Sequence, residues 1–406
     1  MAANFLDPSD GCIGDCNGLE LAAGRYIYSV NLAAGTLTVE KDIWTDLLAS
    51  GYAANQRYYP KKSGSSNWTG VSVADFNQDG NLDVLMSGAL GTDYSGNTTV
   101  FFWDFTNGFV DTYHDSGNNH SKGTGRLNIA DVDNDGQLNI NYVSNNVLYS
   151  LNENLVPLWT KTVDELSSGF TGCTRFDFDD DGTVETVYRS ESRLIIIDGT
   201  DGSDRFSIPC VSRTQEEYPI VADVDGDGAS EICVTCYTSD ATTFDPYSNT
   251  VKAHVRVYEA DGGESWQPSR PVWNQQAYFN VNVNDDLTIP QQQQDHSVVF
   301  SDGVCTDGEN RALNQFMVQA PLLNEDGCSN YVSPDLDLES NITATTASCP
   351  ETELDVSFSI GNIGDVAVSG TVPVSFYDGD PFQVGSTYLN TVFISVLDFD
   401  VGETQD

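Results

Sequence analysis

The stretch Ala222-Asp-Val-Asp-Gly-Asp-Gly-Ala-Ser-Glu231 is the most informative part of this chain. It alternates acidic residues through a short turn, places glycine after the third acid, and closes with an acid at the ninth position of the loop. The first acid falls at position 75, 131, 177 or 223 in four copies, which gives steps of 56, 46 and 46 residues. The other copies read Ala74-Asp-Phe-Asn-Gln-Asp-Gly-Asn-Leu-Asp83, Ala130-Asp-Val-Asp-Asn-Asp-Gly-Gln-Leu-Asn139 and Phe176-Asp-Phe-Asp-Asp-Asp-Gly-Thr-Val-Glu185.

 The second copy therefore carries aspartate at positions 131, 133 and 135 and an asparagine at the closing position.

Short apolar runs border each copy. Ile220-Val-Ala222 precedes the fourth loop and Ile232-Cys-Val234 follows it, and such short β-branched runs indicate strands rather than helices. An outer hairpin follows these two strands. It consists of a strand, a tight Asp-Gly turn and another strand, most clearly in Arg193-Leu-Ile-Ile-Ile-Asp-Gly-Thr-Asp-Gly202. Four strands in each repeat of this length predict the blade of a β-propeller.

The two ends of the repeat region are less regular. Asn17-Gly-Leu-Glu20 aligns with Gly80-Asn-Leu-Asp83 and predicts an N-terminal blade whose first strand is weak or absent. Residues 268 to 325 predict a divergent last blade without an acidic loop. We therefore expect an all-β fold with a propeller of about six to seven four-stranded blades.

A different pattern follows near residue 332. Leu354–Ile360, Val372–Tyr377 and Val392–Leu397 alternate apolar and polar residues between turns, which predicts an immunoglobulin-like β-sandwich. We expect a propeller over residues 1–332 and a sandwich over residues 333–406 that continues past Asp406.

The acidic loops predict calcium sites. Alternate carboxylates in a tight turn point at a common centre, and ligand sets made only of oxygen select hard cations. An EF-hand is rejected, because strands flank these loops and position 12 holds Met86, Tyr142, Tyr188 or Val234. The seventh position contributes a backbone carbonyl, as at Ala229, and we expect about four Ca²⁺ ions. The predicted ligands are Asp75, Asn77, Asp79, Asn81 and Asp83; Asp131, Asp133, Asp135, Gln137 and Asn139; Asp177, Asp179, Asp181, Thr183 and Glu185; and Asp223, Asp225, Asp227, Ala229 and Glu231.

Composition supports the same expectation. Seventeen Lys plus Arg against sixty-one Asp plus Glu give a net charge of −44 over 406 residues. Such a chain repels nucleic acid and anionic lipid, and bound cations would relieve its self-repulsion. The sequence has no apolar run of about 18 residues, so we expect no direct membrane insertion.

Nine cysteines without a zinc-ribbon spacing favour structural disulfides in an oxidising compartment. Cys12–Cys16 and Cys305–Cys328 are the predicted pairs.

The four loops resemble the FG-GAP repeats of integrin α-chain-like propellers, whose blades carry calcium loops between their first two strands. Cys16-Asn-Gly-Leu-Glu-Leu-Ala-Ala-Gly24 and Arg270-Pro-Val-Trp-Asn-Gln-Gln-Ala-Tyr278 look like segments of large secreted Bacteroidetes proteins that use the type IX secretion system. Phe358-Ser-Ile-Gly-Asn-Ile-Gly364 and Val374-Ser-Phe-Tyr377 resemble the CARDB domain of bacterial adhesion proteins. The resemblance implies a secreted protein at the bacterial cell surface.

Two classes of function stay open. No nucleophile elbow, zinc-protease motif or phosphate-binding loop occurs, so we expect no enzyme but a surface module for adhesion, filament assembly or a giant adhesin. Its partner would be an extracellular protein, a glycan or a second copy of itself. The alternative is a carbohydrate-active propeller, a lectin or polysaccharide lyase. Trp266, Trp273, Tyr278 and Phe279 are candidate sugar platforms, although packing in the core is the favoured interpretation.

Overall fold

The structure is a computed structural model of the whole chain. It describes residues 1–6, 12–14, 16, 18–59, 70–91, 98–114, 124–165, 171–179, 181–212, 218–226, 228–238, 252–260, 266–284, 286–290, 293, 314–322, 336–338, 342–346, 354–362, 368–379, 387–399 and 404–405.

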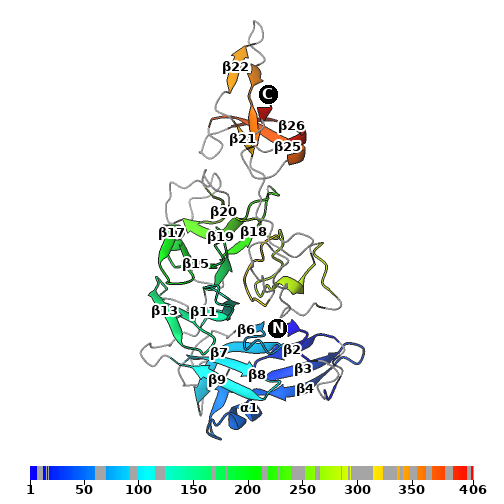
Figure 1. Cartoon of the computed structure of the whole chain (residues 1–406), viewed down its shortest axis with the longest axis vertical. Helices are drawn as coiled ribbons and strands as arrows, with labels where there is room; N and C mark the ends of the chain where they lie inside the picture. The colour runs from blue at the N-terminus through cyan, green and yellow to red at the C-terminus, as the bar shows by residue number, and fades with distance from the viewer. Residues whose placement is uncertain are drawn as a thin grey trace.

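Five antiparallel sheets follow one another along the chain (Figure 1). In the first, third, fourth and fifth sheets, consecutive strands are neighbours, so each of these sheets is a simple up-and-down meander. In the second sheet, β5 and β6 both pair with β7. The sheets are β1 (Ala2–Ala3), β2 (Glu20–Ala23), β3 (Tyr26–Asn31) and β4 (Thr36–Asp42); β5 (Arg57–Tyr59), β6 (Val71–Ala74), β7 (Asp83–Gly91), β8 (Thr98–Asp104) and β9 (Phe109–Tyr113); β10 (Asn128–Ala130), β11 (Asn139–Ser144), β12 (Val147–Leu151) and β13 (Pro157–Thr162); β14 (Cys173–Phe176), β15 (Glu185–Arg189), β16 (Arg193–Ile197) and β17 (Asp204–Pro209); and β18 (Ile220–Ala222), β19 (Glu231–Thr238) and β20 (Lys252–Tyr258).

The first strands of successive sheets lie side by side. β6 contacts β10, β10 contacts β14, and β14 contacts β18, while the later strands of each sheet lie farther out. Sheets that fan out from adjacent inner strands form a β-propeller, and the all-β prediction is confirmed. The interfaces between blades are apolar, with Trp103, Phe101, Tyr149 and Tyr188 almost completely buried.

A short segment, residues 314–322, crosses the inner ends of the blades. Phe316 and Ile129 exchange two backbone hydrogen bonds of 3.0 Å, and the amide of Gln319 donates to the carbonyl of Arg175 at 3.0 Å. The side chain of Asn314 bonds both the amide and the carbonyl of Asp75, at 2.8 and 2.7 Å. One segment thus connects three neighbouring blades, which no sequence pattern indicated.

The described part of residues 268–325 contributes a 3-10 turn, η2 (Asn280–Asn282), and single β-bridges. It therefore supports the neighbouring blades without adding a sheet of its own among the described residues. In the N-terminal blade, the first strand was expected to be weak or absent; it is present but has only two residues, and β1 pairs with β2 through Ala2–Leu21 and Ala3–Glu20.

One helix, α1 (Ile43–Ala49), joins the first two sheets. The Asp42 carboxylate accepts the amide of Trp44 at 3.1 Å and caps the first turn, which explains why the helix begins here. Ile43 and Leu47 face the core.

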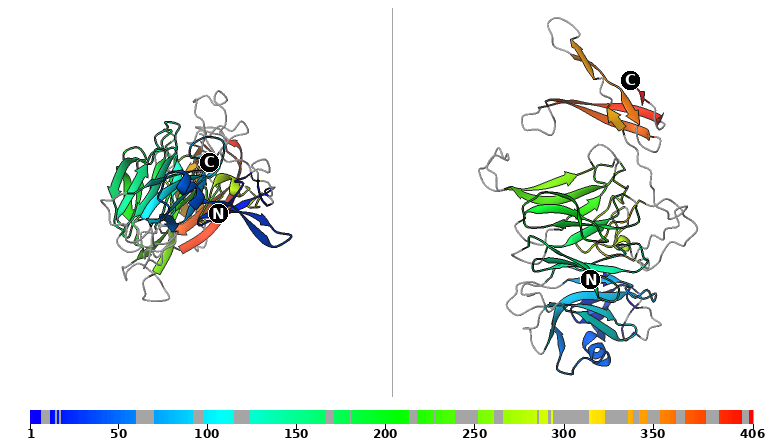
Figure 2. Two further views of the ribbon diagram at one scale, coloured as in Figure 1. Left: turned by 90° about the horizontal axis from the view of Figure 1, so that it is seen from below. Right: turned by 60° about the vertical axis from the view of Figure 1, so that its left-hand side comes forward.

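The described strands after residue 335 form three further small sheets, which lie beyond the blades in Figure 1 and in the right-hand view of Figure 2. The strands are β21 (Leu336–Leu338), β24 (Ile360–Asn362) and β27 (Thr404–Gln405); β22 (Thr343–Thr346) and β23 (Leu354–Ser357); and β25 (Val368–Asp378) and β26 (Thr387–Phe399). Ile360 and Val374 are buried together, with Phe358 against Phe376 at 5.7 Å, so the sheet of β21, β24 and β27 and the sheet of β25 and β26 share one core, as in a β-sandwich.

Gln319 gives a test of the crossing segment. Its amide nitrogen donates to the carbonyls of Val221 and Arg270, both at 2.8 Å, and its oxygen accepts the Tyr278 hydroxyl at 2.9 Å. Because Gln319→Ala leaves these buried groups unpaired, we expect it to lower the free energy of unfolding by about 3 kcal/mol. Urea denaturation measures the change, and the exposed Gln275→Ala is the control. Equal stability of the two variants would show that the segment does not hold the blades together.

Candidate metal centres

All four acidic loops connect the first and second strands of a blade, and their closing residues occupy equivalent positions in the sheet. The residue before the loop pairs with the residue that closes it. The pairs are Ala74–Asp83, Ala130–Asn139, Phe176–Glu185 and Ala222–Glu231. Strands on both sides of the loops confirm the rejection of an EF-hand.

One oxygen of each closing side chain binds the loop backbone. Glu231 Oε2 accepts the amide of Val224 at 2.8 Å. The same bond is made by Asp83 to Phe76 at 2.8 Å, by Asn139 to Val132 at 2.8 Å and by Glu185 to Phe178 at 3.0 Å. Glu185 and Glu231 each also place an oxygen within 4.8 Å of two other acids of the loop.

The first acid of each loop accepts backbone amides of the turn: the first three accept the amide of the sixth-position glycine, and Asp223 accepts the amide of Gly226 at 2.7 Å. Asp75, for example, accepts the amides of Asp79 and Gly80, both at 2.9 Å. Glycine is needed at the sixth position because the backbone there has a positive φ, which other residues rarely adopt. The φ values are 91° at Gly80, 83° at Gly136, 84° at Gly182 and 97° at Gly228.

Three of the loops bring three carboxylates together. One oxygen from each member lies within 4.8 Å of the others in the sets Asp131, Asp133 and Asp135; Asp177, Asp179 and Glu185; and Asp223, Asp225 and Glu231. Burial, followed by repulsion from Asp135 and Asp133, raises the pKa of Asp131 to about 6. A cation at the centre would remove this repulsion, so the donor sets fit a hard divalent ion. Asp227 lies outside the described residues.

The first loop is built differently. Its acids do not form a three-carboxylate set among the described residues. Its neighbours include Asp104, the last residue of β8, and Asn107 in the turn to β9, which the sequence did not indicate. Asn77 Nδ2 donates to Asp104 at 3.1 Å, and Asn107 Nδ2 donates to Asp79 at 2.7 Å. Burial and the nearby Asp104 raise the pKa of Asp83 well above its ordinary value.

In the third loop, a guanidinium lies among the carboxylates. Arg205 of β17 contacts Asp179 at 2.8 Å, Asp181 at 3.4 Å and Glu185 Oε1 at 2.5 Å. It also contacts Asp198, in the turn between β16 and β17, at 3.2 Å. Neither residue was predicted to belong to the site, because both come from the outer hairpin of the blade.

Glu20, which the sequence aligns with Asp83, occupies the closing position in the first sheet. It pairs with Ala3 in the register of the other loops, and its Oε2 accepts the amides of Phe5 at 2.9 Å and Leu6 at 3.0 Å. Its loop is longer and lacks the alternating acids, so Glu20 was not predicted to belong to a metal site. Burial raises the pKa of Glu20 to about 6.

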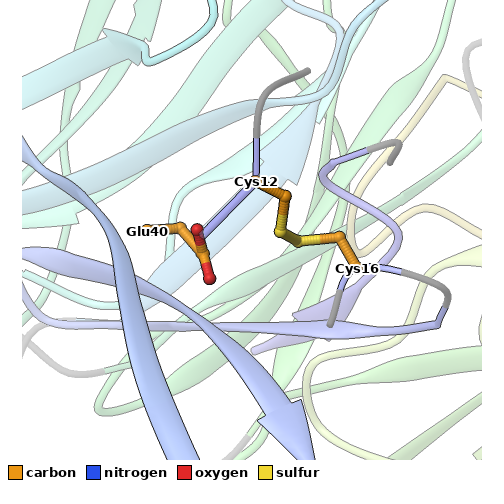
Figure 3. Close-up of side chains that lie close together, drawn as sticks. All are labelled: Cys12, Cys16 and Glu40. Carbon is orange, nitrogen blue, oxygen red and sulfur yellow. A yellow bond between two sulfur atoms is a disulfide. The ribbon is translucent and has the colours of Figure 1, made fainter. Parts of the chain in front are cut away.

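A disulfide between Cys12 and Cys16 lies in this N-terminal loop, as predicted (Figure 3). The carboxylate of Glu40 beside it accepts the amides of Ile13 at 2.7 Å and Gly14 at 2.8 Å. Because the two sulfurs are bonded to each other and Glu40 holds the backbone, this group acts as a clamp and not as a metal site.

A second disulfide, Cys210–Cys236, was not predicted and joins the fourth sheet to the fifth. Cys305 and Cys328 lie outside the described residues. Among the described cysteines, Cys173 and Cys233 are unpaired.

The aromatic candidates belong to the core, as the favoured interpretation predicted. Tyr278 and Phe279 are buried; Trp273 stacks on Tyr278 at 4.4 Å and Phe279 lies against Phe316 at 6.1 Å. Trp266 packs on Phe178 at 4.7 Å. In the described parts of the chain, no helix is long and apolar enough to cross a membrane.

Comparison with known proteins identifies no family. No family and no curated protein matches the chain, so the FG-GAP and CARDB resemblances remain unconfirmed. Distant likenesses to solved structures exist. The Vibrio cholerae biofilm matrix protein Bap1 is 16% identical with a TM-score of 0.38, over 74% of this chain and 61% of that one. BamB from Moraxella catarrhalis is 10% identical with a TM-score of 0.32, over 97% and 87%. A protein of unknown function from Bacteroides caccae is 11% identical with a TM-score of 0.30, over 65% and 79%. The chain thus spans about three fifths of the Bap1 chain, and these scores establish no function.

Glu20 provides a pH test of the loop architecture. An acid whose pKa is higher in the folded state binds protons more tightly there, so its charge lowers stability as pH rises from about 4.5 to about 6. We expect Glu20→Gln to gain about 2 kcal/mol over the wild type between pH 4.5 and pH 7.5 in EGTA, because glutamine carries no charge to bury. Chemical denaturation at both pH values measures the difference. Glu259→Gln, at an exposed site, should show no such gain, and a parallel pH response of Glu20→Gln and wild type would contradict the prediction.

Proposed function

We propose that this chain is a non-catalytic, secreted protein of the bacterial cell surface, whose calcium-stabilised propeller acts in adhesion or extracellular assembly. The convergence of three carboxylates in each of the second, third and fourth loops is the observation that carries the calcium assignment. The hydrogen bond from the closing side chain to the backbone recurs in all four loops, so they share one backbone arrangement.

Calcium is the ion that these loops suit best. Their donors are carboxylates, amides and backbone carbonyls, and Ca²⁺ accepts six to eight such oxygens in flexible geometry. Mg²⁺ demands a stricter octahedron and keeps several waters, while zinc prefers nitrogen and sulfur. Extracellular calcium is abundant enough to fill sites of modest affinity.

The oxidised cysteines support an extracellular location. Cys12–Cys16 and Cys210–Cys236 would be reduced in an ordinary cytosol, whereas disulfides persist outside the cell. Together with a net charge of −44, they favour a protein exposed to solvent, salt and divalent ions.

An exposed sheet edge supports assembly over catalysis. β20 pairs with β19 on one side, and no other described strand pairs with its second side. Val255 and Val257 on this strand are 71% and 51% exposed. An open apolar edge strand readily accepts a strand from a partner, so a second copy or an extracellular protein would bind by β-augmentation, while a glycan ligand would use the loops.

Calcium removal tests the metal assignment. With dissociation constants of about 10⁻⁴ to 10⁻³ M, each site adds about 1.4 kcal/mol when calcium is ten times that constant. Four sites would add about 5 to 6 kcal/mol. We expect EGTA to lower the melting temperature by roughly 10 °C, and added calcium to restore it. Magnesium at equal concentration is the control, and an unchanged melting curve would mean that the loops are not filled.

The proposed role has its own test. The purified chain should self-associate or bind surface components in calcium, measured by analytical ultracentrifugation and by binding to glycan arrays and bacterial cells. Val255→Lys in β20 should weaken self-association, while Val156→Lys on an exposed turn should not. Turnover of acidic polysaccharides, abolished by a mutation on the propeller face, would instead support the carbohydrate-active alternative.

A further inference from the structure

The side chain of Arg205 occupies the place where a cation would bind in the third loop. Its Nη1 lies 2.8 Å from Asp179 and 2.5 Å from Glu185, and its Nη2 lies 3.4 Å from Asp181. Asp179 and Glu185 are two of the three residues whose oxygens converge in this loop. The guanidinium therefore uses part of the donor set predicted for the metal.

The oxygen that Arg205 contacts is the decisive one. Glu185 is completely buried; its Oε2 is engaged by the amide of Phe178, and its Oε1 faces Arg205. Leaving a buried carboxylate without a counter-charge is costly, whereas a planar guanidinium can contact several carboxylates at once. Arg205 itself is 31% exposed, so it has room to move toward solvent.

The blade that carries the third loop, β14 to β17, differs from the preceding blade in the residue at this position. Both β13 and β17 carry a bulge beside the turn, and the register places Arg205 where the preceding blade has Leu158. Leu158 is 40% exposed and cannot compensate charge. A leucine is thus tolerated at this position by the same blade architecture, and the arginine adds a positive charge that the preceding blade lacks there.

We propose that Arg205 is an internal cation of the third loop, which holds Asp179, Asp181 and Glu185 together without metal and competes with a metal ion for Glu185. The first part stands independently, and the competition rests on the calcium binding proposed above. A divalent ion at Glu185 Oε1 repels the guanidinium, so the ion must displace Arg205 before it binds fully. The third loop consequently remains folded in the absence of calcium and binds calcium more weakly than it would with a neutral residue.

The substitution Arg205→Leu tests both parts, because leucine is the residue of the preceding blade. In EGTA, we expect a lower melting temperature than wild type and faster hydrogen exchange in peptides covering residues 176–185. In a calcium titration by calorimetry, one site should gain affinity by about tenfold, which corresponds to the loss of one competing ion pair. Saturating calcium should then narrow the stability gap between variant and wild type.

Two further variants make the result specific. Arg193→Leu removes the same charge from the adjacent strand, where the arginine contacts Ser207, and it should change neither calcium affinity nor exchange in the third loop. Arg205→Lys keeps the charge but cannot bridge three carboxylates, so its melting temperature in EGTA and its calcium affinity should lie between those of wild type and Arg205→Leu. If Arg205→Leu folds only in calcium, that result supports the proposal, and Arg205→Lys is then used for the measurements in EGTA.

The outcomes separate the two proposals. If no variant binds calcium but Arg205→Leu is still destabilised in EGTA, Arg205 is an internal cation and the calcium assignment fails. If Arg205→Leu binds calcium as wild type does and matches Arg193→Leu in EGTA, the calcium assignment stands and the inference about Arg205 is overturned.

Discussion

The hydrogen bond between a closing side chain and the backbone amide just after the first acid is the constraint on which the blades depend. It fixes where the inner strand ends and where the second strand begins, as Glu231 does for Val224. It also orients the carboxylate, because one oxygen is committed to the backbone and the other faces the loop. The same bond appears with aspartate, asparagine and glutamate, so the geometry survives changes in side-chain length and charge.

Charge compensation, in contrast, differs from loop to loop. The converging groups of the fourth loop are all acids. The first loop contains amide donors from its own Asn77 and from Asn107, and the third contains the guanidinium of Arg205. In a chain of net charge −44, concentrated acids must be balanced locally, and a common backbone permits several solutions. The four loops are therefore equivalent in fold and distinct in electrostatics.

Local patterns predicted what local patterns control. The acidic loops, their flanking strands and the Cys12–Cys16 bridge are each encoded within about ten residues, and all are found as predicted. Arg205 was missed because it follows Glu185 by 20 residues and meets it only through the bulge in β17. Glu20 was aligned with the closing acids but its first strand, of two residues, was too short to show a pattern.

The crossing segment at residues 314–322 also has consequences for the order of folding. Asn314 contacts Asp75 across 239 residues of chain, whereas each blade is closed by contacts between near neighbours. On the ribosome, the blades from β6 to β20 can form before this segment is synthesised, but the propeller centre cannot be completed until it arrives. Partly assembled blades with uncovered inner strands would then be the species most exposed to aggregation and to assistance by chaperones.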